Sequence, residues 1–299
     1  MMDNRISPSL LSDPESAALV TQLQMAWPTF VVLEATPLSG GLSNRCWRVT
    51  LQHRVHLTTH TCVWRPCSAA TTAFGVSREH EYRLLASFGA MPLAPAPFAY
   101  SETGLLVEWV AGEMASADFP MATLLQLQAQ IHAIAPPAWQ LDCRARAAQY
   151  WTHIAPADQD AELCALHQHF QSQPPKSWFA ATCCHHDLGA YNVIIPPSGH
   201  ATVIDWEYAA AGDPSLDLAL TISANQWDVE TAVCQYCQQR EGVGLPLLAA
   251  PRVWLEAVNA WLPWCDYLAM LWFFVGAQLW DDETYRDCAL SLKQRLLSC

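Results

Sequence analysis

Two short stretches decide the fold of this chain: residues 185–192 read His-His-Asp-Leu-Gly-Ala-Tyr-Asn, and residues 203–207 read Val-Ile-Asp-Trp-Glu. Strand-like runs at residues 192–195 and 201–204 connect them through a Pro-Pro-Ser-Gly turn, and this composition is typical of a hairpin. Three side chains that can bind metal or accept a proton are therefore expected to flank this hairpin: Asp187, Asn192 and Asp205.

These three side chains suit phosphoryl transfer, in which catalysis comes from positioning the acceptor and neutralising charge with magnesium. Asp187 would orient the acceptor hydroxyl and accept its proton. The amide oxygen of Asn192 and the carboxylate of Asp205 would hold the metal. Taken singly, each residue is explained as well by a turn or a strand-end cap, so the joint spacing carries the interpretation.

The pattern H-x-D-x-x-x-x-N followed by Ile-Asp-Trp-Glu resembles the aminoglycoside phosphotransferase and choline kinase superfamily, relatives of the protein kinases. The resemblance implies ATP and Mg²⁺ as cofactors, Asp187 as catalytic base, and Asn192 and Asp205 as metal ligands. Residues 211–219 also resemble the segment that follows in these kinases. There, helix capping by Asp213 and internal support by Asp217 explain those carboxylates at least as well as catalysis does.

The texture of the chain changes near residue 112. Before it, strand-like runs at residues 29–35, 46–51, 61–65, 98–101 and 105–110 enclose one helical segment, residues 77–88. After it, helical patterns dominate, at residues 121–134, 144–154, 161–171, 216–224, 229–240, 253–275 and 284–297. With the resemblance, this predicts an α+β, bilobal, protein-kinase-like fold: a small antiparallel nucleotide-binding lobe with one helix (residues 1–110) and a larger, mainly helical catalytic and substrate-binding lobe (residues 111–299).

A loop between the first two expected strands supplies the first candidate contacts for ATP. Its residues 38–45 read Leu-Ser-Gly-Gly-Leu-Ser-Asn-Arg. Gly40 and Gly41 would let the backbone approach phosphates, to which Ser43 and Asn44 would donate. A Gly-Gly pair alone is usually just a hairpin turn. Its position one strand before Arg65 is what favours a loop that covers the nucleotide.

Arg65 stands where protein kinases have a strand lysine, and its guanidinium would meet phosphate oxygens bidentately. This departs from the protein-kinase pattern, although the choline and thiamine kinase relatives tolerate arginine there. Glu81 would be its ion-pair partner, with Glu79 as the competing assignment and a solvated helix face as the bland alternative. The segment around Glu108 and Val110 resembles the hinge between lobes, whose backbone would meet adenine.

Composition limits the partners. The chain has 52% hydrophobic and 14% charged residues, which is typical of a well-packed globule. Its 15 basic and 28 acidic residues give a net charge of −13, which disfavours nucleic acid and anionic membranes and attracts cations. The oligomeric state stays open.

Cysteine usage and the terminus favour the cytoplasm. The twelve cysteines are scattered, and residues 1–16 lack the pattern of a signal peptide. The apolar run at residues 261–280 is interrupted by Asp266 and Gln278, which favours a buried helix over a membrane span. The cluster at residues 183–186, Cys-Cys-His-His, lacks a second pair at zinc-site spacing, so zinc is not expected.

The sequences of the loop at residues 38–45 and of the run Ile-Asp-Trp-Glu-Tyr-Ala are similar to those of thiamine kinases and bacterial choline kinases, whose acceptors are permanent cations. Near Asp266, the rings of Trp261, Trp264, Tyr267 and Trp272 could form a cage for such a cation, although ordinary helix packing explains most of these rings. Glu207, Asp266 and Trp264 are the candidate residues that would hold the cation by charge and ring face. The first prediction is a small-molecule kinase acting on thiamine. Choline, ethanolamine or an aminoglycoside are the alternatives, and a non-catalytic kinase-like binding protein is the alternative of another class.

Overall fold

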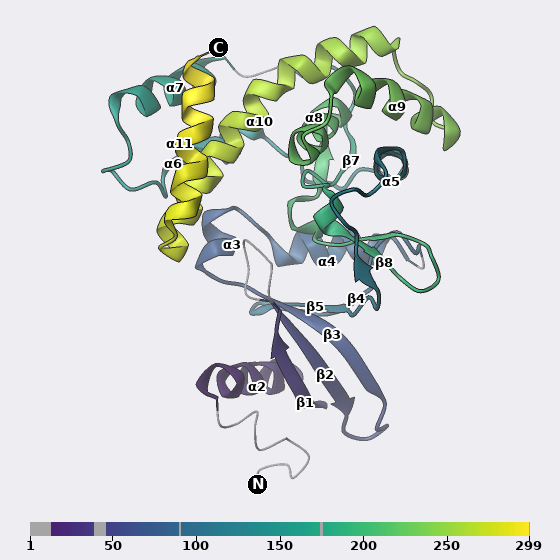
Figure 1. Cartoon of the computed structure of the whole chain (residues 1–299). Helices are drawn as coiled ribbons and strands as arrows, with labels where there is room; N and C mark the ends of the chain where they lie inside the picture. The colour runs from purple at the N-terminus through teal and green to yellow at the C-terminus, as the bar shows by residue number, and fades with distance from the viewer. Residues whose placement is uncertain (1–12, 39–45, 90, 174–175, 299) are drawn as a thin grey trace. The chain divides into compact units, whose positions relative to one another are not determined.

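The computed structural model describes residues 13–38, 46–89, 91–173 and 176–298 (Figure 1). The chain forms two compact units. The first comprises Met1–Thr72, Ser77–Gly112 and Pro196–Thr202, and the second comprises Ala73–Val76, Glu113–Ile195 and Val203–Cys299.

The first unit contains one antiparallel five-stranded sheet in the order β1-β2-β3-β5-β4. Its strands are β1 (Phe30–Pro37), β2 (Trp47–His53), β3 (Thr59–Pro66), β4 (Pro97–Ser101) and β5 (Gly104–Glu108). Helix α4 (Arg78–Ser87) lies between β3 and β4 in the chain and packs against β4 and β5. Ser77 begins this helix by accepting a hydrogen bond from the His80 amide. The predicted sheet and its inserted helix are confirmed.

A helix that the sequence patterns did not predict, α2 (Pro14–Ala26), covers this sheet. Asp13 caps it, and Pro14 occupies its first turn, where a missing amide hydrogen costs nothing. Leu19 and Leu23 pack into a core with Val49, Trp64, Leu106 and neighbouring apolar residues of the sheet. The sheet therefore has a hydrophobic interior of its own.

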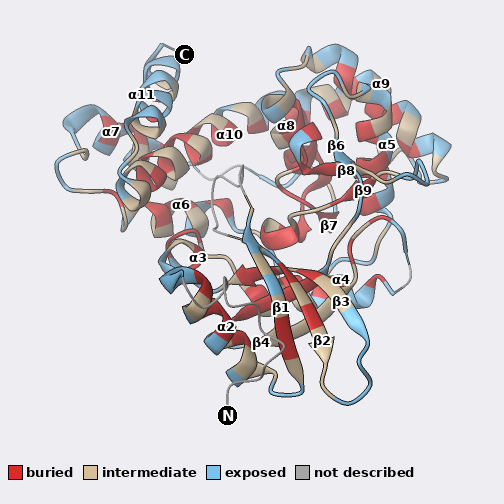
Figure 2. Ribbon diagram, turned by 60° about the horizontal axis from the view of Figure 1, so that its bottom comes forward, coloured by how far each residue is buried: buried red, intermediate tan, exposed pale blue. Residues whose placement is uncertain are grey.

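The second unit is mainly helical, as predicted. Its helices are α5 (Met121–His132), α6 (Cys143–Trp151), α7 (Ala161–Ser172), α8 (Pro214–Asn225), α9 (Val229–Gly242), α10 (Pro251–Trp280) and α11 (Glu283–Leu297), while the short α3 (Ala69–Ala73) straddles the division. Helix α10 packs against α8, α9, α6 and α11, and Figure 2 shows α8 as largely buried. The predicted helical texture is therefore confirmed.

Short strands and turns contain the two polar stretches, residues 185–192 and 203–207. The predicted hairpin is confirmed as β8 (Val193–Ile195) and β9 (Thr202–Val203), which form a sheet with β6 (Glu113–Met114). A further pair, β7 (Thr182–Cys184) and β10 (Ala210–Gly212), was not predicted. The single-turn 3-10 helices η1 (Ala190–Asn192) and η2 (Trp206–Tyr208) complete the region.

Helix α10 contains the apolar run that the sequence analysis assigned to a buried helix. Tryptophans 254, 261 and 264 and several aliphatic residues of this helix are buried inside the second unit. Among the helices of the described ranges, none has both the length and the apolar composition to cross a membrane.

Candidate active site

Backbone and side-chain hydrogen bonds join the two polar stretches of the second unit. The ring of His185 donates from Nε2 to the carbonyl oxygen of Ile204 at 3.0 Å. The amide of Ile204 in turn donates to the carbonyl oxygen of Asn192 at 2.9 Å. Pairing of Cys184 with Ala210 closes the region from the other side. The Asp187 loop and the Asp205 turn are therefore held as one piece.

Both carboxylate oxygens of Asp187 accept a hydrogen bond. The Asn192 side-chain amide donates to Oδ2 at 3.1 Å and to the Asp187 carbonyl at 2.8 Å. The hydroxyl of Tyr191 donates to Oδ1 at 2.7 Å. Because the nitrogen of Asn192 faces Asp187, its amide oxygen faces away and is available to a metal.

Negative charge is concentrated around Asp187. Burial, and then the nearby charges of Asp205 and Glu207, raise the pKa of Asp187 to about 8. Asp205 has a left-handed backbone (φ 62°), a conformation that aspartate tolerates better than most residues. The Asn192 oxygen and the Asp205 carboxylate are hard oxygen donors, so this donor set fits Mg²⁺.

Asp217 of α8 supports the loop from below. Its Oδ1 accepts a hydrogen bond from the backbone amide of His186, and its Oδ2 accepts from His132 at 2.8 Å and Gln128 at 2.9 Å. Burial raises the pKa of Asp217, but these hydrogen bonds and the charges of His132 and His186 outweigh it and lower the pKa overall. The expected internal role of Asp217 is confirmed.

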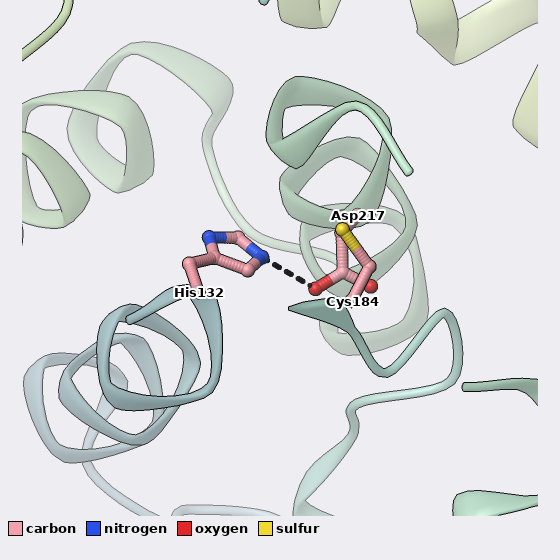
Figure 3. A group of neighbouring side chains, drawn as sticks. All are labelled: His132, Cys184 and Asp217. Atoms are coloured by element: carbon pink, nitrogen blue, oxygen red, sulfur yellow. Dashed lines mark hydrogen bonds and ion pairs between the residues drawn. The ribbon is translucent and has the colours of Figure 1, made fainter. Parts of the chain in front are cut away.

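His132, Cys184 and Asp217 form a buried group whose potential ligand atoms lie within 4.8 Å of one another (Figure 3). Each atom already has a protein partner: His132 bonds Asp217 and the Tyr236 hydroxyl, and the Cys184 thiol donates to the Gly212 carbonyl at 3.4 Å. Burial also raises the pKa of Cys184 well above its usual range, which disfavours the thiolate that a metal requires. We interpret the group as internal support for the loop.

Aromatic rings from distant parts of the second unit meet near Tyr208, the residue that follows Glu207. The indole of Trp272 donates to the hydroxyl of Tyr208 at 3.1 Å, and Trp272 stacks on Phe74 at a centroid distance of 5.1 Å. The guanidinium of Arg146 lies 5.5 Å from the centre of the Tyr208 ring and donates to the Phe74 carbonyl. Glu207 itself is buried, and the next residue in the chain is the aromatic Tyr208.

Two of the predicted acceptor residues, Trp264 and Asp266, are engaged with other helices. Trp264 packs edge-on against Phe170 of α7 at 5.2 Å. The carboxylate of Asp266 pairs with Arg295 of α11 at 3.1 Å. Another tryptophan of the same helix, Trp272, donates a hydrogen bond to Tyr208, the residue after Glu207.

Neither Tyr191 nor Tyr208 was predicted to belong to the site, whereas Trp272 was among the rings considered for a cation cage near Asp266. Tyr191 and Tyr208 each adjoin a predicted site residue, so their position in the motif was an available signal. The contact between Trp272 and Tyr208 had no local signal, because 64 residues separate the two.

The first unit holds a cluster of three charged side chains on β3 and α4. Arg65 Nε lies 2.9 Å from Glu81 Oε1, and Arg78 Nη1 lies 2.7 Å from Glu81 Oε2. The competing residue Glu79 pairs instead with Arg83, and both of these side chains are exposed. Two guanidinium groups share one carboxylate, so the cluster has a net positive charge that suits a polyphosphate.

The other residues predicted to bind the nucleotide lie in the loop before β2 and at the end of β5. Gly40, Gly41, Ser43 and Asn44 lie outside the described residues. Glu108 ends β5 with its side chain exposed, and its amide donates to the Ala96 carbonyl. The adenine contacts assigned to Glu108 and Val110 stay predictions.

Comparisons with known proteins agree on one family. The model of the phosphotransferase enzyme family matches residues 34–254. A thiamine kinase of Escherichia coli O157:H7 (strain EC4115 / EHEC) is 25% identical over 194 residues, which cover 65% of this chain and 68% of that protein.

Solved structures show the same fold. The choline kinase LicA from Streptococcus pneumoniae superposes with a TM-score of 0.71 at 15% identity, covering 96% of this chain and all of the other. A Plasmodium vivax ethanolamine kinase gives a TM-score of 0.72 at 12% identity, covering 95% and 89%. At these identities the likeness shows the kinase-like fold alone, and the predicted α+β bilobal fold class is confirmed.

Proposed function

Because this chain belongs to the phosphotransferase enzyme family and is a small-molecule kinase, we propose that it phosphorylates thiamine to thiamine monophosphate with ATP and Mg²⁺. The thiamine kinases among its relatives, which match across about two thirds of the chain, support this acceptor. The choline kinase with the same fold has been solved with AMP, which supports an adenine nucleotide as donor. We assign nucleotide binding to residues 1–110 and catalysis with acceptor binding to residues 111–299.

The observation that carries the proposal is the concentration of carboxylates at Asp187, Asp205 and Glu207. Burial first, and then repulsion from Asp205 and Glu207, raise the pKa of Asp187. A metal ion and a cationic acceptor would both relieve that repulsion. Glu207 is the residue we assign to the acceptor's positive charge, because it is buried and adjoins the Tyr208 ring.

The chain's own residues have distinct roles in this mechanism. Asp187 orients the acceptor hydroxyl towards the phosphate and accepts its proton. Asn192 fixes Asp187 through its amide nitrogen and, with Asp205, would hold Mg²⁺, which neutralises phosphate charge when bound. Arg65, held by Glu81, would contact the phosphates.

An acceptor panel tests the proposal. ADP release would be measured with ATP and Mg²⁺ in the presence of thiamine, choline, ethanolamine or an aminoglycoside. We expect thiamine to give the highest kcat/KM, and Asp187→Ala to lower turnover by about 10³-fold or more while ATP still binds. Turnover of choline or ethanolamine without turnover of thiamine would contradict the acceptor assignment. Absence of turnover with every acceptor would favour a non-catalytic binding protein.

A further inference from the structure

Tyr191 combines two properties that the proposed mechanism does not use. Its hydroxyl donates to Oδ1 of Asp187 at 2.7 Å, so the phenol lies directly on the proposed base. The residue as a whole is nevertheless 49% exposed. A tyrosine combines an apolar ring with a polar hydroxyl, so a half-exposed ring anchored by its hydroxyl can offer its open face to a ligand.

The chain makes room for this ring at Gly189. A Cβ atom at Gly189 would come within 2.1 Å of the Tyr191 ring. The backbone of Gly189 is extended (φ −120°, ψ 167°), a conformation open to any residue. The need for glycine therefore comes from the ring, which folds back over Gly189 and brings its hydroxyl to Asp187.

We propose that Tyr191 is a specificity-determining residue of the acceptor site: its hydroxyl positions Asp187, and its exposed ring face receives the positive group of the acceptor. This inference rests on the proposed function. A carboxylate oxygen accepts more than one hydrogen bond, so Tyr191 and the acceptor hydroxyl can share Asp187.

The chemistry of the acceptor fits this arrangement. In thiamine the hydroxyl is separated from the cationic thiazolium by two carbon atoms. An acceptor whose hydroxyl meets Asp187 therefore carries its charge about one ring width from the carboxylate, where the Tyr191 ring lies. Ring faces attract such cations, and Tyr191 would complement the carboxylate of Glu207.

Two substitutions separate the hydroxyl from the ring. Tyr191→Phe keeps the ring, so we expect kcat to fall about tenfold while the KM for thiamine changes less than about twofold. Tyr191→Ala removes the ring as well, so we expect the KM for thiamine to rise about tenfold, with the KM for ATP retained. Tyr100→Phe, a tyrosine of β4 in the first unit, is the matched control and should change neither constant.

A neutral acceptor tests the role of the ring face. Hydroxyethylthiazole and its N-methylated thiazolium carry the same two-carbon alcohol and differ in the positive charge. We expect the parent to prefer the thiazolium over the neutral thiazole, and we expect Tyr191→Ala to reduce that preference about tenfold. A general loss of structure would not change the ratio between the two acceptors.

Gly189→Ala provides a test of the geometry. The added methyl group should push the ring off Asp187 and reproduce the Tyr191→Ala defect. In the Tyr191→Ala background the same methyl group should add nothing, because the clash is gone. Equal effects of Gly189→Ala in both backgrounds would overturn the proposed fit.

Different results would overturn the role of Tyr191 and the proposed kinase function. A parent enzyme that turns over thiamine, with unchanged constants in both Tyr191 variants, would overturn the role of Tyr191 and leave the proposed function standing. A parent enzyme that turns over none of the acceptors would overturn both. ADP affinity, measured by calorimetry on each variant, verifies that the variants are folded.

Discussion

At the scale of single residues, Glu81 shows how the buried charges of the first unit are arranged. It lies between Arg65 on β3 and Arg78 one helical turn before it on α4, and it bonds both. The sequence left Glu79 and Glu81 open as partners because both fall on the same helix. The structure distinguishes them by burial: Glu81 is 3% exposed, whereas Glu79 pairs with Arg83 in solvent.

Arg78 should therefore matter for stability although no sequence pattern singled it out. Arg78→Met leaves the buried Glu81 with one guanidinium fewer, and breaking a buried pair costs about 3 kcal/mol. We expect this loss in the free energy of unfolding, measured with urea. Because Glu81 would then neutralise Arg65 more fully, the KM for ATP should also rise.

Arg83→Ala is the matched control for Arg78. Its pair with Glu79 is exposed, and such pairs contribute less than about 1 kcal/mol. Equal losses of stability in Arg78→Met and Arg83→Ala would show that the buried cluster has no special role.

At the scale of elements, much of the fold could be predicted from the sequence. The five strands and the helix between them were visible because alternating and helical spacings are local signals. The three-residue strands β7 and β10 were not visible, since so short a run has no periodicity of its own. Helix α2 was missed because its apolar face is short and is defined by the sheet that it covers.

The candidate site follows the same division. Asp187, Asn192 and Asp205 were identifiable because local spacing and a hairpin bring them together. Trp264 and Asp266 were chosen from composition along α10, and composition does not tell which turn of a long helix faces which neighbour. The structure engages them with α7 and α11 and brings Trp272 to Tyr208.

The cap of α8 leads to a prediction about Asp213. Its carboxylate accepts from the amide and hydroxyl of Ser215 and from the backbone amides of Trp178 and Phe179. Capping was expected from the sequence and is confirmed. Asp213→Ala would lose the cap and leave buried donors unpaired, so we expect a loss of about 3 kcal/mol in the free energy of unfolding.

Asp228, which caps α9, supplies the comparison for Asp213. It accepts hydrogen bonds from the amide and hydroxyl of Thr231, but it is exposed. Water can replace it, so Asp228→Ala should destabilise the chain less than Asp213→Ala does. If Asp213→Ala lowered the free energy of unfolding in denaturant by no more than Asp228→Ala does, Asp213 would contribute no more than a simple helix cap.

At the scale of the whole molecule, the net charge of −13 must accommodate an anionic donor. The positive cluster of Arg65, Glu81 and Arg78 provides local compensation in the first unit. In the second unit, the carboxylates around Asp187 suit the metal and the cationic acceptor that we propose. The sign of the charge therefore varies between sites in a way that the overall composition does not reveal.

Buried titratable groups of the second unit should make the stability of the chain depend on pH. Burial, the largest cause, together with the charges of Arg146 and His185 lowers the pKa of His186 from 6.5 to about 4, against the opposing effects of Asp217 and of the hydrogen bond to Tyr208. Between these values the unfolded chain binds a proton at His186 that the folded chain does not. The stabilisation is therefore complete above the unfolded pKa and is lost as pH falls towards the folded value.

Asp187 acts in the opposite sense over part of the same range, because its folded-state pKa is raised to about 8. The parent's pH curve alone would mix the two effects, so the experiment compares the parent with His186→Gln. We expect their difference in free energy of unfolding to change by up to about 3 kcal/mol between pH 7 and pH 4. His200→Gln, a histidine substitution at an exposed position, is the control. A difference between parent and His186→Gln that is constant over this range would mean that His186 takes up its proton equally in the folded and unfolded chain, and that the loop around Asp187 tolerates a charge at its base.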